Sequence, residues 1–170
     1  PLYILGSSLF GAQLAAHLGL PYSFASHFAP AALTQAVQVY RDNYQPSERH
    51  PEPYVIAAVN VTAADSQEEA DEQWRQVCRT RVRVMAGRGR SLTEAELDML
   101  IDSPAGQQIL DMLRYSAVGT RDVVCRYLEE FRTHAQADEL MVSLQSPSTA
   151  ESLRSMEILA DAASLSPAQR

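Results

Sequence analysis

A strand, a turn of small residues and the start of a helix follow one another in LYILGSSLFG, residues 2–11. Leu2–Leu5 is a short, continuous apolar run, which is typical of a strand buried on both faces of a parallel sheet. Gly6-Ser7-Ser8 follows directly, so backbone N–H groups and hydroxyls are expected to meet at a helix N-terminus. This arrangement is a natural phosphate site. An ordinary serine cap with a glycine for the turn is the alternative, and by itself the more common, interpretation.

The helix that follows this turn is marked by Phe10, Leu14 and Leu18, which recur with the period of a helix face. Gly19 then supplies a typical C-terminal stop. Further apolar runs predict three more strands, at Leu20–Ala25, Tyr54–Ala63 and Glu139–Leu144. A helical pattern follows each of them, and strands that alternate with helices indicate an α/β fold with a parallel sheet.

The number of βα units limits the architecture. A complete (β/α)8 TIM barrel typically needs about 250 residues, and this chain has 170. The four units therefore form either a small doubly wound sheet or half of a barrel. An extra helical excursion precedes the last strand, with Thr93 and Glu96 as a capping box and Ser103-Pro104 at the next helix start. We interpret residues 1–170 as a single domain and residues 87–119 as a helical insertion within it.

The composition argues against several classes of function. The formal net charge is −7, which disfavours nucleic acid and anionic membrane surfaces as partners. All 14 basic residues are arginine, so Schiff-base chemistry on lysine and the lysine of a P-loop are excluded. Cys78 and Cys125 lack the spacing of a metal site or a disulfide framework. With no stretch apolar enough to span a membrane, we expect a cytoplasmic protein.

The stretch GSSLFGAQLAAHLGLP, residues 6–21, resembles the bacterial luciferase-like flavin monooxygenases. The similarity covers nearly the whole chain and points to the single-component branch called luciferase-family oxidoreductase group one. It is specific as a combination of short motifs, which continue through FASHFAP (24–30), PYV (53–55), VGT (118–120) and ADELMV (137–142).

The resemblance implies a fold and a cofactor. The fold is the C-terminal half of a (β/α)8 TIM barrel, strands five to eight, and the cofactor is FMN. An abrupt start in a strand at Pro1 agrees with the expectation that preceding sequence is lacking. The resemblance places the FMN phosphate at the first turn, on the Ser8 hydroxyl and nearby backbone N–H groups. The implied cofactor-binding residues are Gly6, Ser7, Ser8, Leu9, Phe10 and Gly11.

Other polar residues have competing interpretations. His27 lies at the C-terminal end of a predicted strand, which is the catalytic face of a barrel. It either shapes the flavin pocket, acts as an acid or base near neutral pH, or is a structural loop histidine. Asn60, within the strongest strand, is interpreted as a satisfied polar residue. Three arginines on helices are interpreted as solvated or paired, namely Arg41, Arg121 and Arg154.

The function implied by the resemblance is that of a flavin-dependent oxidoreductase. We expect a monooxygenase that uses reduced FMN and O2 on a small organic substrate, with or without a separate flavin reductase. A deazaflavin-dependent hydride-transfer enzyme on the same barrel is one alternative. The other is non-catalytic: a flavin- or phosphate-binding half-barrel, or an interaction module. Because an open half-barrel exposes sheet edges, we also expect a homo-oligomer or pairing with a missing N-terminal half.

Overall fold

The computed structural model describes residues 2–87 and 89–163, which form two compact units. The first unit comprises the residues up to Val59 together with Leu128–Ser143. The second unit comprises Asn60–Tyr127 together with the residues from Leu144 onward. The strands belong to one sheet in the order β1-β2-β3-β4, and β5 pairs with β3 as well. The parallel α/β sheet expected from the sequence is therefore confirmed.

The sheet of the first unit is built from short parallel strands. Strand β1 (Ile4–Gly6) pairs with β2 (Tyr22–Phe24), which in turn pairs with β3 (Val55–Ala63). The register aligns Gly6 with Phe24, and Phe24 with Ala57. The carboxyl ends of β1 and β2 consequently lie at the same edge of the sheet.

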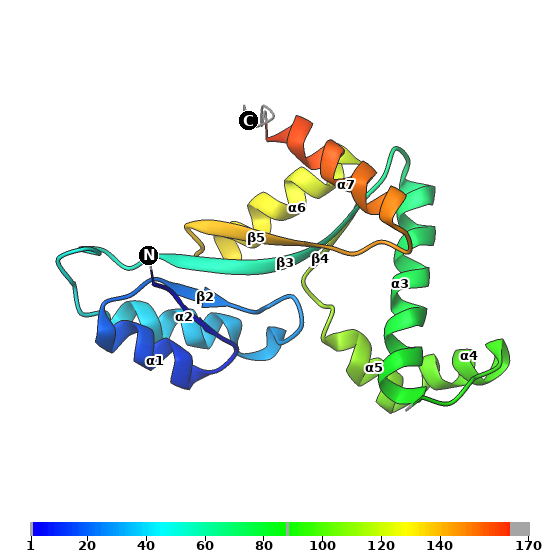
Figure 1. Ribbon diagram of the computed structural model, residues 1–170, viewed down its shortest axis with the longest axis horizontal. Helices are drawn as coiled ribbons and strands as arrows, with labels where there is room; N and C mark the ends of the chain where they lie inside the picture. The colour runs from blue at the N-terminus through cyan, green and yellow to red at the C-terminus, as the bar shows by residue number, and fades with distance from the viewer. Residues whose placement is uncertain (1, 88, 164–170) are drawn as a thin grey trace. The chain divides into compact units, whose positions relative to one another are not determined.

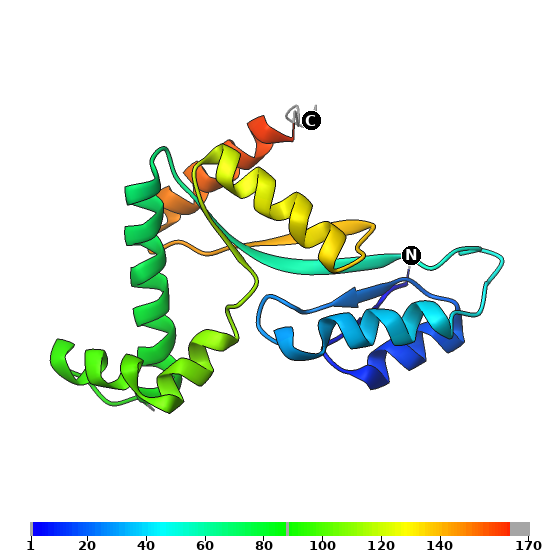
Figure 2. The ribbon, with the colours of Figure 1, turned by 180° about the vertical axis from the view of Figure 1, so that it is seen from behind.

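Two helices accompany these strands in the first unit. Helix α1 (Leu9–Leu18) follows β1, and α2 (Leu33–Asp42) follows β2 after a 3-10 turn at Pro30–Ala32. Both views show α1 and α2 side by side below β2 (Figures 1 and 2). Gly19 ends α1 in the left-handed conformation, with φ 58°, as its position in the sequence predicts.

Helix α1 buries its small residues and exposes its large ones. Its buried positions are Gly11, Ala12, Ala15 and Ala16. The periodic set seen in the sequence lies on the other side, with 72% of Phe10, 37% of Leu14 and 48% of Leu18 exposed. Small side chains let the axis of α1 come close to the elements it packs against. The large side chains of α1 consequently lie on its opposite, exposed face.

The amino ends of β3 and β5 (Glu139–Leu144) are joined through Asp138 in the first unit. One carboxylate oxygen of Asp138 accepts hydrogen bonds from the Val55 N–H at 2.8 Å and from Arg41 Nη2 at 2.8 Å. The Asp138 N–H donates to the Val55 carbonyl at 2.9 Å. This confirms the paired interpretation of Arg41.

The second unit continues β3 and adds β4 (Ser116–Gly119), aligned from Asn60 with Ser116 to Ala63 with Gly119. The sequence prediction missed this strand, because four residues with a single β-branched side chain carry little periodicity. The strand forms here because its partner β3 is long and fully buried.

Helices make up the rest of the second unit. Helix α3 (Gln67–Gly87) follows β3, and α4 (Glu94–Asp102) and α5 (Pro104–Asp111) pack against it near its C-terminal end (Figure 2). The capping box of α4 is present in full. Helices α6 (Arg121–His134) and α7 (Thr149–Ala162) follow β4 and β5. None of the described helices is long and apolar enough to cross a membrane. The half-barrel and single-domain interpretations stay predictions.

Replacing Asp138 with alanine should destabilise the protein. The change leaves the N–H of fully buried Val55 without its acceptor and Arg41 without its carboxylate, at a cost of about 1–3 kcal/mol. Urea unfolding monitored by circular dichroism measures it. Glu129→Ala is the matched control, because among the described residues the Glu129 carboxylate pairs with Arg132 alone, at exposed positions of α6. An Asp138→Ala midpoint no lower than that of Glu129→Ala would contradict the role given to Asp138.

Candidate functional site

The turn between β1 and α1 presents unpaired backbone donors. β1 ends at Gly6, and the chain bends at Ser7 and Ser8 before α1 begins at Leu9. The first hydrogen bond of the helix runs from the Ala12 N–H to the Ser8 carbonyl at 3.4 Å. The N–H groups of the three residues before Ala12 therefore have no partner among the described residues, as expected for a first helical turn.

Ser8 occupies the N-cap position of α1 without capping it. Its backbone is extended, with φ −147° and ψ 165°, and its side chain makes no capping hydrogen bond. Ser7 and Ser8 are both exposed, and neither hydroxyl has a hydrogen bond within the described residues. In contrast, Ser148 at the start of α7 accepts a hydrogen bond from the Glu151 N–H at 3.3 Å. The ordinary-cap interpretation of Ser8 thus lacks its characteristic bond, and the hydroxyl stays available to a ligand.

Two glycines let the helix approach the strand. A Cβ on Gly6 would lie 3.5 Å from the Gly11 Cα, and a Cβ on Gly11 would lie 3.4 Å from the Gly6 Cα. The Tyr22 ring covers the same spot, because a ring carbon lies 3.4 Å from the Gly11 Cβ position. At these distances an added Cβ would make van der Waals contacts with the facing glycine and with Tyr22, so α1 and β1 meet closely beside the donors of the first turn.

Tyr22 stabilises the turn through a hydrogen bond to its backbone. Its hydroxyl donates a hydrogen bond to the Ser8 carbonyl at 3.0 Å, and its side chain is fully buried. Burial raises the pKa of Tyr22 to about 12 because the charged phenolate would lose its hydration. The sequence showed Tyr22 only as one residue of a strand. No local pattern predicts its contact with Ser8, because the pairing of β1 with β2 creates it.

His27 lies near this turn within the first unit. The Ala25 N–H donates to the Gly6 carbonyl at 2.9 Å, which joins the segment after β2 to the end of β1. His27 follows in a turn, half-buried, with its ring edge-to-face against Phe28 at 4.8 Å between centroids. Ser26, next to it, is buried, and its hydroxyl donates to the Ala58 carbonyl at 2.5 Å. The structure thus brings His27 and the first turn to the same edge of the sheet.

The remaining polar candidates are structural. Asn60 is fully buried in β3, and its side-chain amide donates from Nδ2 to the Tyr115 carbonyl at 3.4 Å, which agrees with a satisfied polar residue. Arg154 Nη2 pairs with Asp65 at 2.6 Å, and its guanidinium lowers the pKa of that carboxyl. The paired interpretation holds for Arg154 as it does for Arg41.

The arrangement at the first turn can bind an anion. Unpaired N–H groups at a helix start carry a partial positive charge and point outward, and hydroxyls beside them add donors. No carboxylate lies within Gly6–Gly11.

Comparison with known proteins identifies the family. The family model described as luciferase-like monooxygenase matches residues 1–138. A protein of Escherichia coli strain K12 named luciferase-like monooxygenase is 38% identical over 163 residues, which is 95% of this chain and 49% of that protein. The chain belongs to the luciferase-like monooxygenase family. It spans about half the length of the curated relatives it matches.

Two solved structures are similar to this chain in fold. The crystal structure of apo-MsnO8 is 30% identical with a TM-score of 0.77, over 98% of this chain and 52% of that chain. The oxygenating constituent of 3,6-diketocamphane monooxygenase from Pseudomonas putida, solved with FMN, is 15% identical with a TM-score of 0.56. That match covers 92% of this chain and 45% of that chain, and it supports the fold alone.

The buried phenol of Tyr22 should make the folded protein sensitive to alkali. Because its pKa is raised from 10.0 to about 12, the folded state holds this proton longer than the unfolded state does. The associated stability is present below pH 10 and is lost as the pH rises through about 12. Absorbance at 295 nm should show late-titrating tyrosines, Tyr22 and the similarly shifted Tyr40. Tyr22→Phe should remove part of the late-titrating absorbance, and an unchanged titration curve would contradict the assignment.

Proposed function

We propose that this protein is an FMN-dependent oxidoreductase, a monooxygenase that uses reduced flavin and O2 on a small organic substrate. The observation that carries the proposal is the first turn of α1 in a chain of the luciferase-like monooxygenase family. That turn offers three unpaired N–H groups and two unused serine hydroxyls, at Leu9–Gly11 and Ser7-Ser8. Such donors match the phosphate end of FMN in chemistry and in charge.

Each residue of the turn has a proposed task. Gly6 and Gly11 lie face to face where the helix meets the strand, next to these donors. The Ser8 hydroxyl and the N–H groups of Leu9, Phe10 and Gly11 hold the phosphate. Tyr22 keeps the Ser8 carbonyl turned inward, away from an incoming anion, by donating to it. His27, at the same sheet edge, forms part of the pocket wall or exchanges a proton there.

The cofactor would supply the electron transfer and oxygen chemistry, and the protein would supply position and electrostatics. FMN accompanies the diketocamphane monooxygenase of the same fold, which supports a flavin here. This chain would contribute the phosphate anchor and one wall of the pocket, because it spans half of its relatives. A deazaflavin is the competing cofactor, and the absorption spectrum of the purified protein with FMN added distinguishes the two.

Ser8→Ala should weaken FMN binding without unfolding the helix. Loss of one hydrogen bond to a charged phosphate corresponds to a dissociation constant raised about tenfold or more. The melting temperature should stay the same, because the Ser8 side chain makes no capping bond to lose. Titration of the protein with FMN, followed by quenching of flavin fluorescence, measures the affinity.

Ser148→Ala is the matched control, since Ser148 caps α7 through its side chain. Its melting temperature should fall, with a loss of about 0.5–2 kcal/mol, while the FMN affinity stays unchanged. An unchanged FMN dissociation constant in Ser8→Ala would remove the phosphate role from this turn.

The exposed face of α1 supports a second proposal, that this chain binds another copy of itself or a segment that supplies the N-terminal half of a barrel. Leu2 just before β1 and Leu5 on β1 are 66% and 69% exposed, and β1 pairs only with β2 among the described strands. Phe10, Leu14 and Leu18 on α1 are exposed as well, so the strand and the helix each present large apolar side chains. Exposed apolar side chains that gather in one region are typical of a surface that a partner covers.

Light scattering after size-exclusion chromatography tests this proposal on the isolated chain. We expect a dimer that Leu14→Glu converts to monomer, because the charge would have to be buried in the interface. Met99→Glu is the control. Met99 is 75% exposed on α4, which belongs to the second unit, whereas Leu14 belongs to the first. If both the unaltered chain and the control are monomers, the proposed dimer is contradicted.

A further inference from the structure

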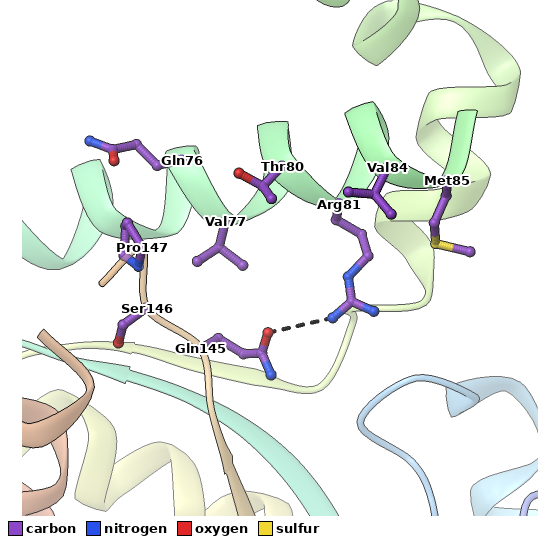
Figure 3. A pocket seen from close by; sticks show the side chains of 9 residues that line it. All are labelled: Gln76, Val77, Thr80, Arg81, Val84, Met85, Gln145, Ser146 and Pro147. Carbon is purple, nitrogen blue, oxygen red and sulfur yellow. Dashed lines mark hydrogen bonds between the residues drawn. The ribbon is translucent and has the colours of Figure 1, made fainter. Parts of the chain in front are cut away.

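The second unit contains a pocket that neither the family nor the flavin proposal explains. Its volume is about 480 Å³, and it lies between α3 and the segment that follows β5 (Figure 3). Side chains spaced as i, i+1, i+4, i+5, i+8 and i+9 place one face of α3 along it. These residues are Gln76, Val77, Thr80, Arg81, Val84 and Met85. Residues 145–147 form the opposite wall.

Arg81 stands apart from the other arginines that the structure describes. Most of them pair with a carboxylate, as the half-buried Arg41 and Arg79 do. Those without a carboxylate partner in the described chain are exposed, except Arg81, which is half-buried. The hydrogen bond of Arg81 goes from Nη2 to Gln145 Oε1 and is long, at 3.4 Å. Figure 3 shows the two side chains pointing toward one another across the pocket.

The surroundings leave this positive charge uncompensated. No residue that lines the pocket is acidic. A guanidinium carries five donors in a planar fork, and one long bond to a neutral amide uses little of that capacity. The net charge of the chain is −7, so the attraction for an anion must come from this local group and not from the protein's overall field.

The rest of the lining is apolar at one end. Val84 is 69% exposed and Met85 is 43% exposed on α3, beyond Arg81 in the chain. Val77 and Pro147 add further apolar surface. Thr80 and Gln76 supply polar groups on the same helix. The pocket therefore combines one cationic fork with an apolar wall.

We propose that this pocket binds a small organic monocarboxylate, with the carboxylate paired to Arg81 and the apolar chain along Val84 and Met85. The planar fork of a guanidinium matches the two oxygens of a carboxylate. A phosphate dianion is disfavoured, because a single cation with no helix N-terminus in the lining would leave half its charge unmatched. The inference stands on the second unit alone and does not require flavin binding.

Isothermal titration of the full chain with hexanoate, and separately with hexanamide, tests the proposal. Hexanoate should bind and the neutral amide of equal length should bind at least tenfold more weakly. Arg81→Gln should weaken hexanoate binding about tenfold to a hundredfold, because it removes the charge-assisted bonds. Arg81→Lys should recover part of that loss, since it restores the charge without the planar fork.

Arg126→Gln is the control for net charge. Arg126 belongs to the second unit, is exposed and has no carboxylate partner among the described residues, so its removal should leave the affinity unchanged. Far-ultraviolet circular dichroism verifies that each variant is folded. Equal binding of hexanoate and hexanamide, or an Arg81→Gln variant that binds as the unaltered chain does, would overturn the proposal. Displacement of hexanoate by equimolar inorganic phosphate would overturn the choice of a carboxylate.

Discussion

Strand β3 is the constraint on which the structure depends, because all nine of its residues are buried and three other strands pair with it. A buried strand must satisfy every backbone and side-chain polar group. At its amino end, the Val55 N–H finds Asp138. Toward its carboxyl end, the Thr62 hydroxyl donates to the Gln145 carbonyl at 2.6 Å, and the Ala63 N–H donates to Ser155 Oγ at 2.9 Å. Each of these partners comes from far along the chain. The strand therefore fixes where α2, α7 and the ends of β5 can lie within their own units.

A second constraint acts at the first turn. The proposed anion site needs an exposed helix start, and the packing of α1 brings this helix close to β1. Gly6 and Gly11 face each other at this approach, where a Cβ on either residue would lie 3.4–3.5 Å from the Cα of the other. The buried hydroxyl of Tyr22 satisfies the Ser8 carbonyl and leaves the neighbouring donors free. These contacts are the physical basis of the proposed phosphate anchor. The cost of the close approach is that α1 uses its alanines for packing and turns its large apolar side chains outward.

Much of the fold could be predicted from the sequence. The strand at Glu139–Leu144 and the whole of β3 were predicted from apolar runs, and the capping box of α4 was predicted from Thr93 and Glu96. Strand β4 was missed because its four residues have no periodicity of their own. The burial of α1 could not be deduced either, because the period of Phe10, Leu14 and Leu18 identifies an apolar face without saying what covers it.

The sequence by itself determined the class of fold, the place of the first turn and the family, since these follow from local patterns and short motifs. Only the tertiary structure decided which donors are free, which polar residues are structural and where charge is left uncompensated. The sequence left two interpretations of Ser8, a helix cap and a phosphate-binding residue. In the described turn its side chain makes no capping hydrogen bond, so the hydroxyl is available to an anion. Nothing in the sequence distinguishes Arg81 from the other arginines. The structure places it in a pocket beside Gln145, with no carboxylate among the lining residues. The physical reason is that local patterns report periodicity, whereas free donors and unpaired charges depend on partners distant in the chain.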